Sequence, residues 1–221
     1  MLDNINIIID FDSTFTKVEG LDELANIALV NNPNREVIVA QIKRLTEAGM
    51  NGEISFAESL TRRVKMLQAN ETHITALIEF LRENVTGSIL RNKAFFRENQ
   101  ARIYVLSGGF YEFIAPVVTE LGILPNHIFA NNFRFNSNGN IIGVDEINLL
   151  AHDGGKVKTV QMLGLSGETI IIGDGFTDYE IKRAGLATKF YAFTENVRRE
   201  KVVEVADKVV SSFDEFLLDL G

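Results

Sequence analysis

The sequence contains no cysteine, and it has no long hydrophobic run. Without cysteine the chain cannot form a disulfide framework or use thiolate chemistry, so a cytoplasmic location is the simplest expectation. No stretch approaches the ~20 apolar residues that a membrane-spanning helix requires. The opening residues Met-Leu-Asp-Asn lack the basic head of a secretory signal, which agrees with the same compartment.

Positive charge is also scarce, because 22 lysines and arginines face 30 acidic residues and the net charge is −8. This balance argues against nucleic acid or an anionic membrane as a partner. It does not exclude a phosphorylated ligand, which needs only local positive charge. The 221 residues suffice for one good-sized core with an inserted module, and they leave the oligomeric state open.

The most informative pattern lies in residues 5–20. Ile5 and residues 7–9 form a β-branched apolar run, typical of a strand buried on both faces. The run ends in Asp10 and Asp12, whose side chains leave an extended chain on the same side. Two buried carboxylates this close are costly unless a positive partner joins them, and a divalent cation is the usual one. Alternatively, both acids merely end the strand and cap the next helix.

Residues 17–83 are predicted to be all-helical, before any second strand appears. Ile38, Ile42 and Leu45 share one face of a helix over residues 37–48, and Gly49 and Gly52 are expected to bracket a turn. Two further helices are expected, one starting at Ser55 with Glu58 as a capping box and one starting at Asn70 or Thr72.

The rest of the chain alternates between predicted strands and helices, as in a doubly wound (Rossmann-like) α/β fold with a mostly parallel sheet. Strands are expected at 101–106, 169–173, 190–192 and 208–210, and a β-hairpin at 128–135 and 140–144. A helix with Pro116 in its first turn should start near residues 113–115, and another should span 197–205.

The expected organisation is an α/β core of residues 1–16 and 84–221 with an inserted helical cap domain, residues 17–83. Its hinges would lie near Lys17 and residues 82–86. Ligands of such sheets bind outside the carboxyl ends of the strands. Three predicted strands end there in reactive or polar groups, namely Asp10 with Asp12, Ser107, and Asp174.

Several motifs follow one another along nearly the whole chain. They are Asp-Phe-Asp-Ser-Thr (10–14), Glu-Gly-Leu-Asp-Glu-Leu-Ala (19–25), Ser-Gly-Gly-Phe (107–110), Phe-Ala-Asn (129–131), Gly-Gly-Lys (154–156) and Gly-Asp-Gly-Phe-Thr-Asp (173–178). This set resembles the phosphoserine phosphatase family of the haloacid dehalogenase superfamily. The resemblance implies Mg²⁺-dependent hydrolysis of O-phosphoserine through an aspartyl-phosphate. Alternatives are the same chemistry on another small phosphomonoester, transfer of the phosphoryl group to another alcohol, or a silent protein that binds a phosphorylated metabolite.

The resemblance also implies roles for core residues. Asp10 would be the nucleophile and Asp12 the general acid and base. Mg²⁺ would bind Asp10, Asp174 and the backbone carbonyl of Asp12, a hard-oxygen donor set. Asp178 would hold metal-bound waters and Lys156, and Lys156 would neutralise the nucleophile and the phosphoryl group, with Lys158 as its competitor. The implied phosphate-binding residues are Ser107, Gly108, Gly109 and Thr177.

By the same resemblance, the cap would select the substrate. Glu19 would bind an ammonium group and Arg63 a carboxylate, while Met50 and Phe56 would shield the site. The plainer alternatives are that Glu19 caps a helix, that Phe56 is core, and that the Arg62–Arg63 pair is a solvated face. The three histidines match no motif and are expected to be structural: His73, His127 and His152.

Overall fold

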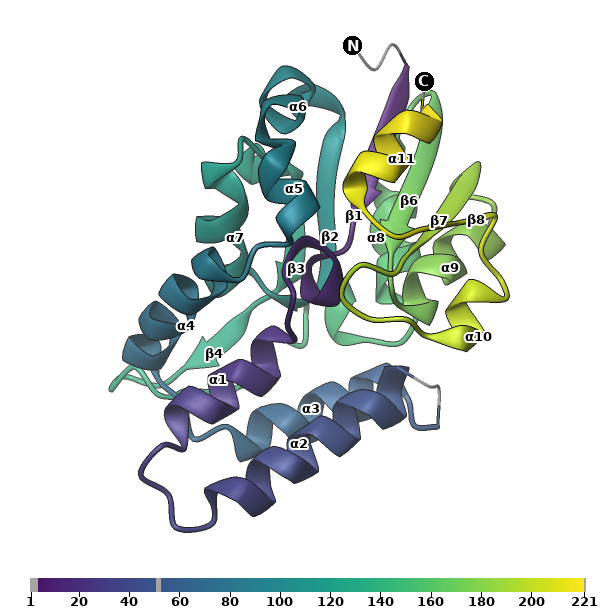
Figure 1. Ribbon diagram of the computed structural model, residues 1–221. Helices are drawn as coiled ribbons and strands as arrows, with labels where there is room; N and C mark the ends of the chain where they lie inside the picture. The colour runs from purple at the N-terminus through teal and green to yellow at the C-terminus, as the bar shows by residue number, and fades with distance from the viewer. Residues whose placement is uncertain (1–3, 51–52, 221) are drawn as a thin grey trace.

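The computed structural model describes residues 4–50 and 53–220 and contains a six-stranded parallel sheet (Figure 1). Its strand order is β3-β2-β1-β6-β7-β8, and every neighbouring pair is parallel. The strands are β1 (Ile5–Ile9), β2 (Ile103–Phe110), β3 (Ile128–Asn131), β6 (Glu168–Gly173), β7 (Lys189–Phe193) and β8 (Lys208–Val210). The predicted doubly wound α/β fold is therefore confirmed.

Helices cover both faces of this sheet. Alternate residues of its central strands point to opposite faces, and each face belongs to its own hydrophobic cluster. Ile7 and Ile9 face one cluster and Ile8 faces the other. The first cluster is covered by α5 (Gly87–Arg91), α6 (Lys93–Glu98), α7 (Tyr111–Glu120) and α11 (Phe213–Leu220). The second is covered by α8 (Gly155–Leu163), α9 (Phe176–Arg183) and α10 (Glu200–Val203). Within the described residues, three short 3₁₀ turns join elements, at Gln100–Arg102, Pro125–His127 and Leu149–Ala151.

The helical insertion lies beneath the carboxyl ends of the strands, at the edge opposite the two termini (Figure 1). It comprises α1 (Gly20–Ala28), α2 (Arg35–Met50), α3 (Phe56–Met66) and α4 (Glu71–Glu83). The Ser55 and Asn70 side chains cap α3 and α4 as expected. α4 packs beside α7 of the core, and α3 packs on the hairpin. The division into core and cap at residues 17–83 remains a prediction.

The chain enters and leaves the insertion at adjacent points. Thr16 and Val85 form an antiparallel bridge, and Lys17 N donates to Asn84 O at 2.9 Å. The predicted hinge segments are thus hydrogen-bonded to each other. Before the crossing, a single π-helical turn, Phe11–Phe15, leads away from Asp10, with Ser13 at a positive φ of 54°.

Several predicted boundaries were wrong. β2 runs on through Ser107, Gly108 and Gly109 to Phe110, with an irregular register opposite β3. α7 therefore begins at Tyr111, and Pro116 lies in its interior, where the helix lacks one N–H donor. Packing of the buried Phe113, Ile114, Val117 and Val118 outweighs that cost.

The remaining differences concern element ends. The predicted strand 128–135 divides into β3, in the main sheet, and β4 (Phe133–Phe135), which forms the predicted hairpin with β5 (Ile141–Val144). α10 spans only Glu200–Val203, so residues 197–199 are loop. Gly49 lies in α2 and not in a turn. A Cβ atom there would sit 3.0 Å from Ser59 of α3, so the glycine permits close packing of the two helices. Gly52 lies outside the described residues.

Candidate active site

Two aspartates follow neighbouring strands at the carboxyl edge of the sheet. Asp10 follows β1 and Asp174 follows β6, and their side chains are nearly fully buried. Asp10 N donates to Ile172 O at 3.0 Å, and Thr14 Oγ1 donates to Asp174 Oδ1 at 3.0 Å. These bonds fix both acids on one side of the π-helical turn.

Lys156 lies between two of the predicted acids. Its Nζ is 3.0 Å from Asp10 Oδ1 and donates to Asp178 Oδ1 at 2.7 Å, with all three side chains buried. Burial alone would lower the pKa of Lys156, but Asp10 and Asp178 outweigh it and raise the pKa above its usual value. Lys158 instead contacts the Asp153 carbonyl at the surface. The geometry favours Lys156 over Lys158.

Asp12 lines the same cavity as Asp10 and Lys156. Its Oδ1 accepts from Gly20 N at 2.7 Å, the first amide of α1. Burial raises its pKa to about 7, although the Gly20 hydrogen bond opposes this, and repulsion from Asp10 raises it further. Asp12 is therefore near half-protonated at neutral pH, as a group that both gives and takes a proton requires.

The Ser107–Gly109 segment lies beside these acids. Ser107 Oγ accepts from Gly109 N at 2.9 Å, and Asn131 Nδ2 donates to Gly108 O at 2.9 Å. A Cβ atom at Gly108 would lie 2.6 Å from Cζ of Phe56, so only glycine lets this ring rest on the strand. Phe56 thus closes the site from the insertion side.

These groups surround an inner cavity of about 30 Å³. Such a volume has room for one or two water molecules and is too small for a phosphorylated metabolite. An outer cavity of about 360 Å³ adjoins it across Met50, Phe56 and Thr177. The inner cavity is lined by Asp10, Asp12, Glu19, Leu21, Met50, Phe56, Arg63, Ser107, Gly108, Gly109, Lys156 and Thr177. All predicted site residues except Asp174 and Asp178 are in that set.

The insertion contributes two charged groups to this cavity. Glu19 accepts from Ser13 Oγ at 2.7 Å, and burial, Asp12 and Asp174 raise its pKa well above the usual value. Arg63 is buried, and its Nη1 donates to Thr46 Oγ1 at 3.2 Å while its Nε has no hydrogen-bond partner. Arg62, by contrast, is exposed and pairs with Glu58. Arg63 therefore lines the cavity and retains one buried donor without a hydrogen-bond partner.

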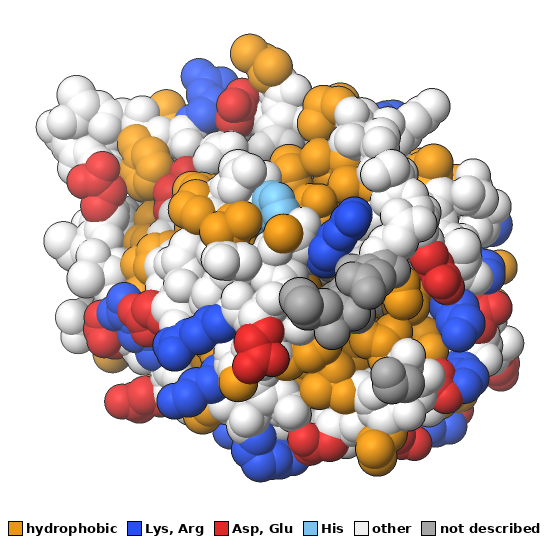
Figure 2. Space-filling view, turned by 90° about the horizontal axis from the view of Figure 1, so that it is seen from above, with side chains coloured by type: hydrophobic (Ala, Val, Ile, Leu, Met, Phe, Trp, Pro, Cys, Tyr) orange, Lys and Arg blue, Asp and Glu red, His pale blue; other side chains and the backbone are white. Residues whose placement is uncertain are grey.

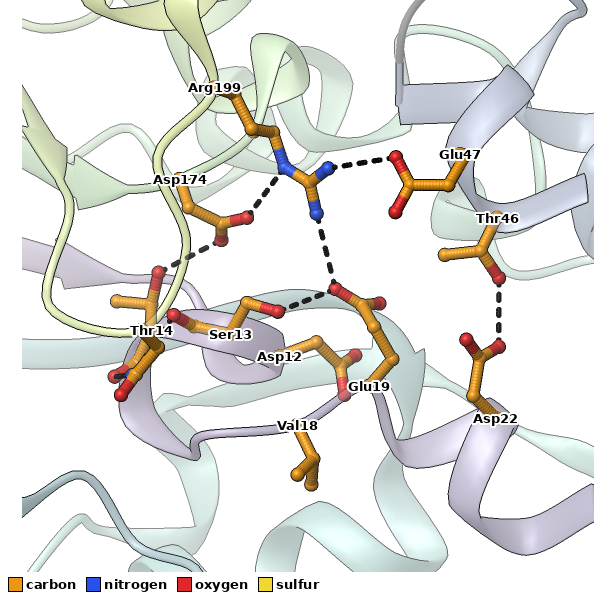
Figure 3. Close-up of polar contacts among 12 residues, drawn as sticks. Asp12, Ser13, Thr14, Val18, Glu19, Asp22, Thr46, Glu47, Asp174 and Arg199 are labelled. Carbon is orange, nitrogen blue, oxygen red and sulfur yellow. Dashed lines mark hydrogen bonds and ion pairs between the residues drawn. The ribbon is translucent and has the colours of Figure 1, made fainter. Parts of the chain in front are cut away.

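Sequence reasoning missed several residues around Glu19 (Figure 3). The guanidinium of Arg199 contacts Asp174, Glu19 and Glu47. Thr46 Oγ1 donates to Asp22 Oδ1 at 2.8 Å, which orients the threonine that holds Arg63. No sequence motif marks Arg199, because its segment reads as part of a surface helix.

The predicted metal ligands are Asp10, Asp174 and the Asp12 carbonyl, and the charges around them bear on whether a cation fits there. Among residues 4–50 and 53–220, no three acidic or histidine side chains converge as a ready metal cage. The expected donor set needs only two carboxylates and the Asp12 carbonyl. Burial first, and then repulsion from Asp10, raise the pKa of Asp174 and of Asp178, so added positive charge nearby would favour the ionised carboxylates. A hard dication at Asp10 and Asp174 would supply that charge, so the residues fit the group.

The histidines lie apart from these acids, each with a local hydrogen bond. His73 accepts from Asn70 N, His127 contacts the Ile103 carbonyl, and His152, which borders the outer cavity, contacts the Glu146 carbonyl. Their expected structural role agrees with these contacts.

Comparison with known proteins agrees with this arrangement. A profile of haloacid dehalogenase-like hydrolases matches residues 6–185, which defines the class of the protein. The human phosphoserine phosphatase is 31% identical over 214 residues, covering 96% of this chain and 91% of that protein. The chain therefore belongs to the phosphoserine phosphatase family of haloacid dehalogenase-like hydrolases, and it is a phosphoric monoester hydrolase. The family named from the sequence is confirmed.

Solved structures agree in fold. A phosphoserine phosphohydrolase-like protein from Francisella tularensis superposes with a TM-score of 0.87 at 31% identity, covering 98% of this chain and 99% of that one. A phospho-aspartyl intermediate analogue of phosphoserine phosphatase gives a TM-score of 0.78 at 25% identity, with 98% of both chains covered. No helix within the described ranges is long and apolar enough to cross a membrane.

The surface gives no sign of a nucleic-acid interface on the side that carries the termini. Seen from above, lysine and arginine side chains alternate there with acidic and hydrophobic ones (Figure 2). No field of one charge covers that face, in line with the net charge of −8.

Proposed function

We propose that this hydrolase converts O-phosphoserine into serine and inorganic phosphate. The observation that carries the proposal is that two chemically different groups of residues line one small cavity. Asp10, Lys156 and the Ser107–Gly109 segment come from the sheet side, and Glu19 and Arg63 come from the helical insertion. We assign the first group to a phosphoryl end of the substrate and the second to an end that carries the ammonium and carboxylate of an amino acid.

At the phosphoryl end, Asp10 is the nucleophile. Its Oδ1 accepts from Phe11 N at 2.7 Å and contacts Lys156, so we assign the attack to Oδ2. The new Oδ2–P bond forms as the P–O bond to the serine oxygen breaks, which gives an aspartyl-phosphate. Ser107, Gly108, Gly109 and Thr177 donate to the phosphoryl oxygens, and Lys156 offsets their charge.

Asp12 moves the protons. With a pKa of about 7 it carries a proton in a large share of molecules, and it gives that proton to the departing serine oxygen. The resulting carboxylate then takes a proton from the water that attacks the aspartyl-phosphate. This second step releases phosphate, restores Asp10 and returns Asp12 to its starting state.

The insertion end reads the amino acid. Glu19 binds the substrate ammonium, and Arg63 binds the carboxylate through its unpartnered Nε. Met50 and Phe56 cover the bound substrate and exclude water. We further propose that residues 17–83 act as the cap and swing about the paired crossings at Thr16 and Val85.

We propose Mg²⁺ as the metal, held by the Asp10 and Asp174 carboxylates and the Asp12 carbonyl. When bound, it supplies positive charge to the carboxylates and to the transferred phosphoryl group.

Asp178 accepts from Lys156 Nζ through Oδ1 and from Gly175 N through Oδ2, so it orients the lysine toward Asp10. The cytoplasm stays the expected compartment.

Phosphate release from phosphoserine, with phosphothreonine and phosphoethanolamine as comparisons, tests this function. We expect phosphoserine to have the highest kcat/KM, and EDTA to abolish turnover until Mg²⁺ is restored. Equal or better turnover of phosphoethanolamine would contradict the assignment of Arg63. Undiminished turnover after complete chelation would contradict the metal.

A further inference from the structure

The loop of residues 194–199, between β7 and α10, contacts both the site and the helical insertion through its last residue. Its last residue, Arg199, has a side chain that is only 10% exposed. Nε donates to Asp174 Oδ2 at 3.0 Å, Nη2 lies 3.5 Å from Glu19 Oε1, and Nη1 lies 3.4 Å from Glu47 Oε2 (Figure 3). One guanidinium therefore contacts three carboxylates.

These carboxylates belong to different parts of the fold. Asp174 follows β6 of the core, Glu19 directly precedes α1, and Glu47 lies near the end of α2. All three nitrogens of the guanidinium are used, each toward a different partner. A lysine presents a single nitrogen and cannot reproduce this arrangement.

The loop itself is fixed to the core side of the hinge. Asn196 Nδ2 lies 3.1 Å from Ser13 O and donates to Thr86 Oγ1 at 2.7 Å. Glu195 accepts from Ser88 N at 3.2 Å. Arg199 therefore projects from a segment that stays with the sheet, and only Glu19 and Glu47 belong to the part that must move to admit substrate.

We propose that Arg199 is a positioning residue that holds the helical insertion closed against the metal-binding side of the core. The three contacts of its guanidinium are called the Arg199 bridge. This inference rests on the proposed function in one respect, namely that the insertion is the mobile cap. In the absence of substrate the bridge maintains the closed cavity, and cap opening breaks its contacts to Glu19 and Glu47 while the contact to Asp174 remains.

The contacts of the bridge differ in burial, which ranks their contributions. The Asp174 and Glu19 side chains are 2% and 16% exposed, whereas Glu47 is 64% exposed. An ion pair in contact with water is screened and contributes little, so Glu19 holds the insertion more strongly than Glu47 does.

The absence of cysteine allows a direct test. Ala40 of α2 and Glu204 at the end of α10 are both exposed, so Ala40→Cys and Glu204→Cys create the only two labelling sites. Spin-label distances are measured on the full chain with EDTA and no substrate. In the Arg199→Gln variant we expect a longer and broader distance distribution than in the parent. Arg198→Gln, an exposed neighbour paired with Glu200, is the matched control and should match the parent.

A second variant separates cap closure from general destabilisation. The double variant Glu19→Gln/Glu47→Gln leaves the Arg199–Asp174 pair intact and should give the same long distance. A distribution in Arg199→Gln and in the double variant that superimposes on the parent would overturn the proposal. Because no substrate is present, this outcome is independent of the phosphoserine assay.

Discussion

The two halves of the site are built in different ways. On the core side, Asp10 and Asp174 directly follow strands and Ser107 lies within the second half of β2, so the sheet itself sets their spacing. On the insertion side, Glu19 directly precedes α1, whereas Phe56 and Arg63 both lie on α3, and side-chain contacts such as that of Thr46 with Arg63 hold them. From this comparison we infer that the reaction depends on the sheet scaffold, and we propose that the choice of substrate depends on the inserted helices.

The charges of the two halves also differ in how they are compensated. In the core half, Lys156 is paired with two acids before any ligand binds. In the insertion half, Arg63 keeps an unpartnered Nε, and burial lowers its pKa despite nearby acids. We therefore expect core substitutions to affect chemistry and folding, and insertion substitutions to affect substrate affinity.

Replacing Asp10 with Asn should have the largest effect. It removes the nucleophile, so phosphate release should fall by a factor on the order of 10⁴ or more. The melting temperature should not decrease, because the change removes one of several repelling carboxylates. Turnover that survives with the fold intact would assign the nucleophile elsewhere and erase the distinction between the halves.

Replacing Lys156 with Met should come next. The change leaves Asp10 and Asp178 buried without their cation, at a cost of about 3–5 kcal/mol in the free energy of unfolding. Activity should fall by about 10²–10³-fold. Lys158→Met is the matched control and should change both quantities little, since its side chain is exposed. Equal effects of the two variants would contradict the role given to Lys156.

The pKa of Asp12 predicts a pH dependence in metal-free protein. Because the pKa is about 7 in the folded state and 3.8 as the reference, the folded state binds the proton more tightly. The resulting stability is complete below pH 3.8 and is lost as the pH rises through 7. Asn cannot titrate, so Asp12→Asn should gain stability relative to the parent between pH 4 and pH 8, by up to about 4 kcal/mol. Denaturant unfolding in EDTA measures this difference, and a flat difference would refute the raised pKa.

Replacing Arg63 with Ala should have the smallest effect and sharpens the comparison most. Loss of a charged hydrogen bond of about 1.5–3 kcal/mol should raise KM for phosphoserine by roughly 10- to 150-fold. KM for phosphoethanolamine, which lacks the carboxylate, should change little. Arg62→Ala is the control, because Arg62 points to solvent and pairs with Glu58. A matching loss for both substrates would give Arg63 a structural role instead.

The same division explains what the sequence could predict. Residues at strand ends were found because buried β-branched runs mark the strands and the parallel fold brings their ends together. Arg199 was missed because it reaches the site across the fold, from a segment that was predicted as helix, is a loop in the structure, and carries no motif. Pro116 misled the placement of α7, because a local rule for proline says nothing about the buried side chains that stabilise the helix around it.

The adjacency of Thr16 and Val85 has a further consequence for how such a molecule can change over generations. Because the insertion begins and ends at neighbouring points, the inserted helices can be lengthened, shortened or exchanged without a change in the order or connection of the strands. Substrate preference can thus diversify by replacing one module, while strands that carry the reaction remain in place.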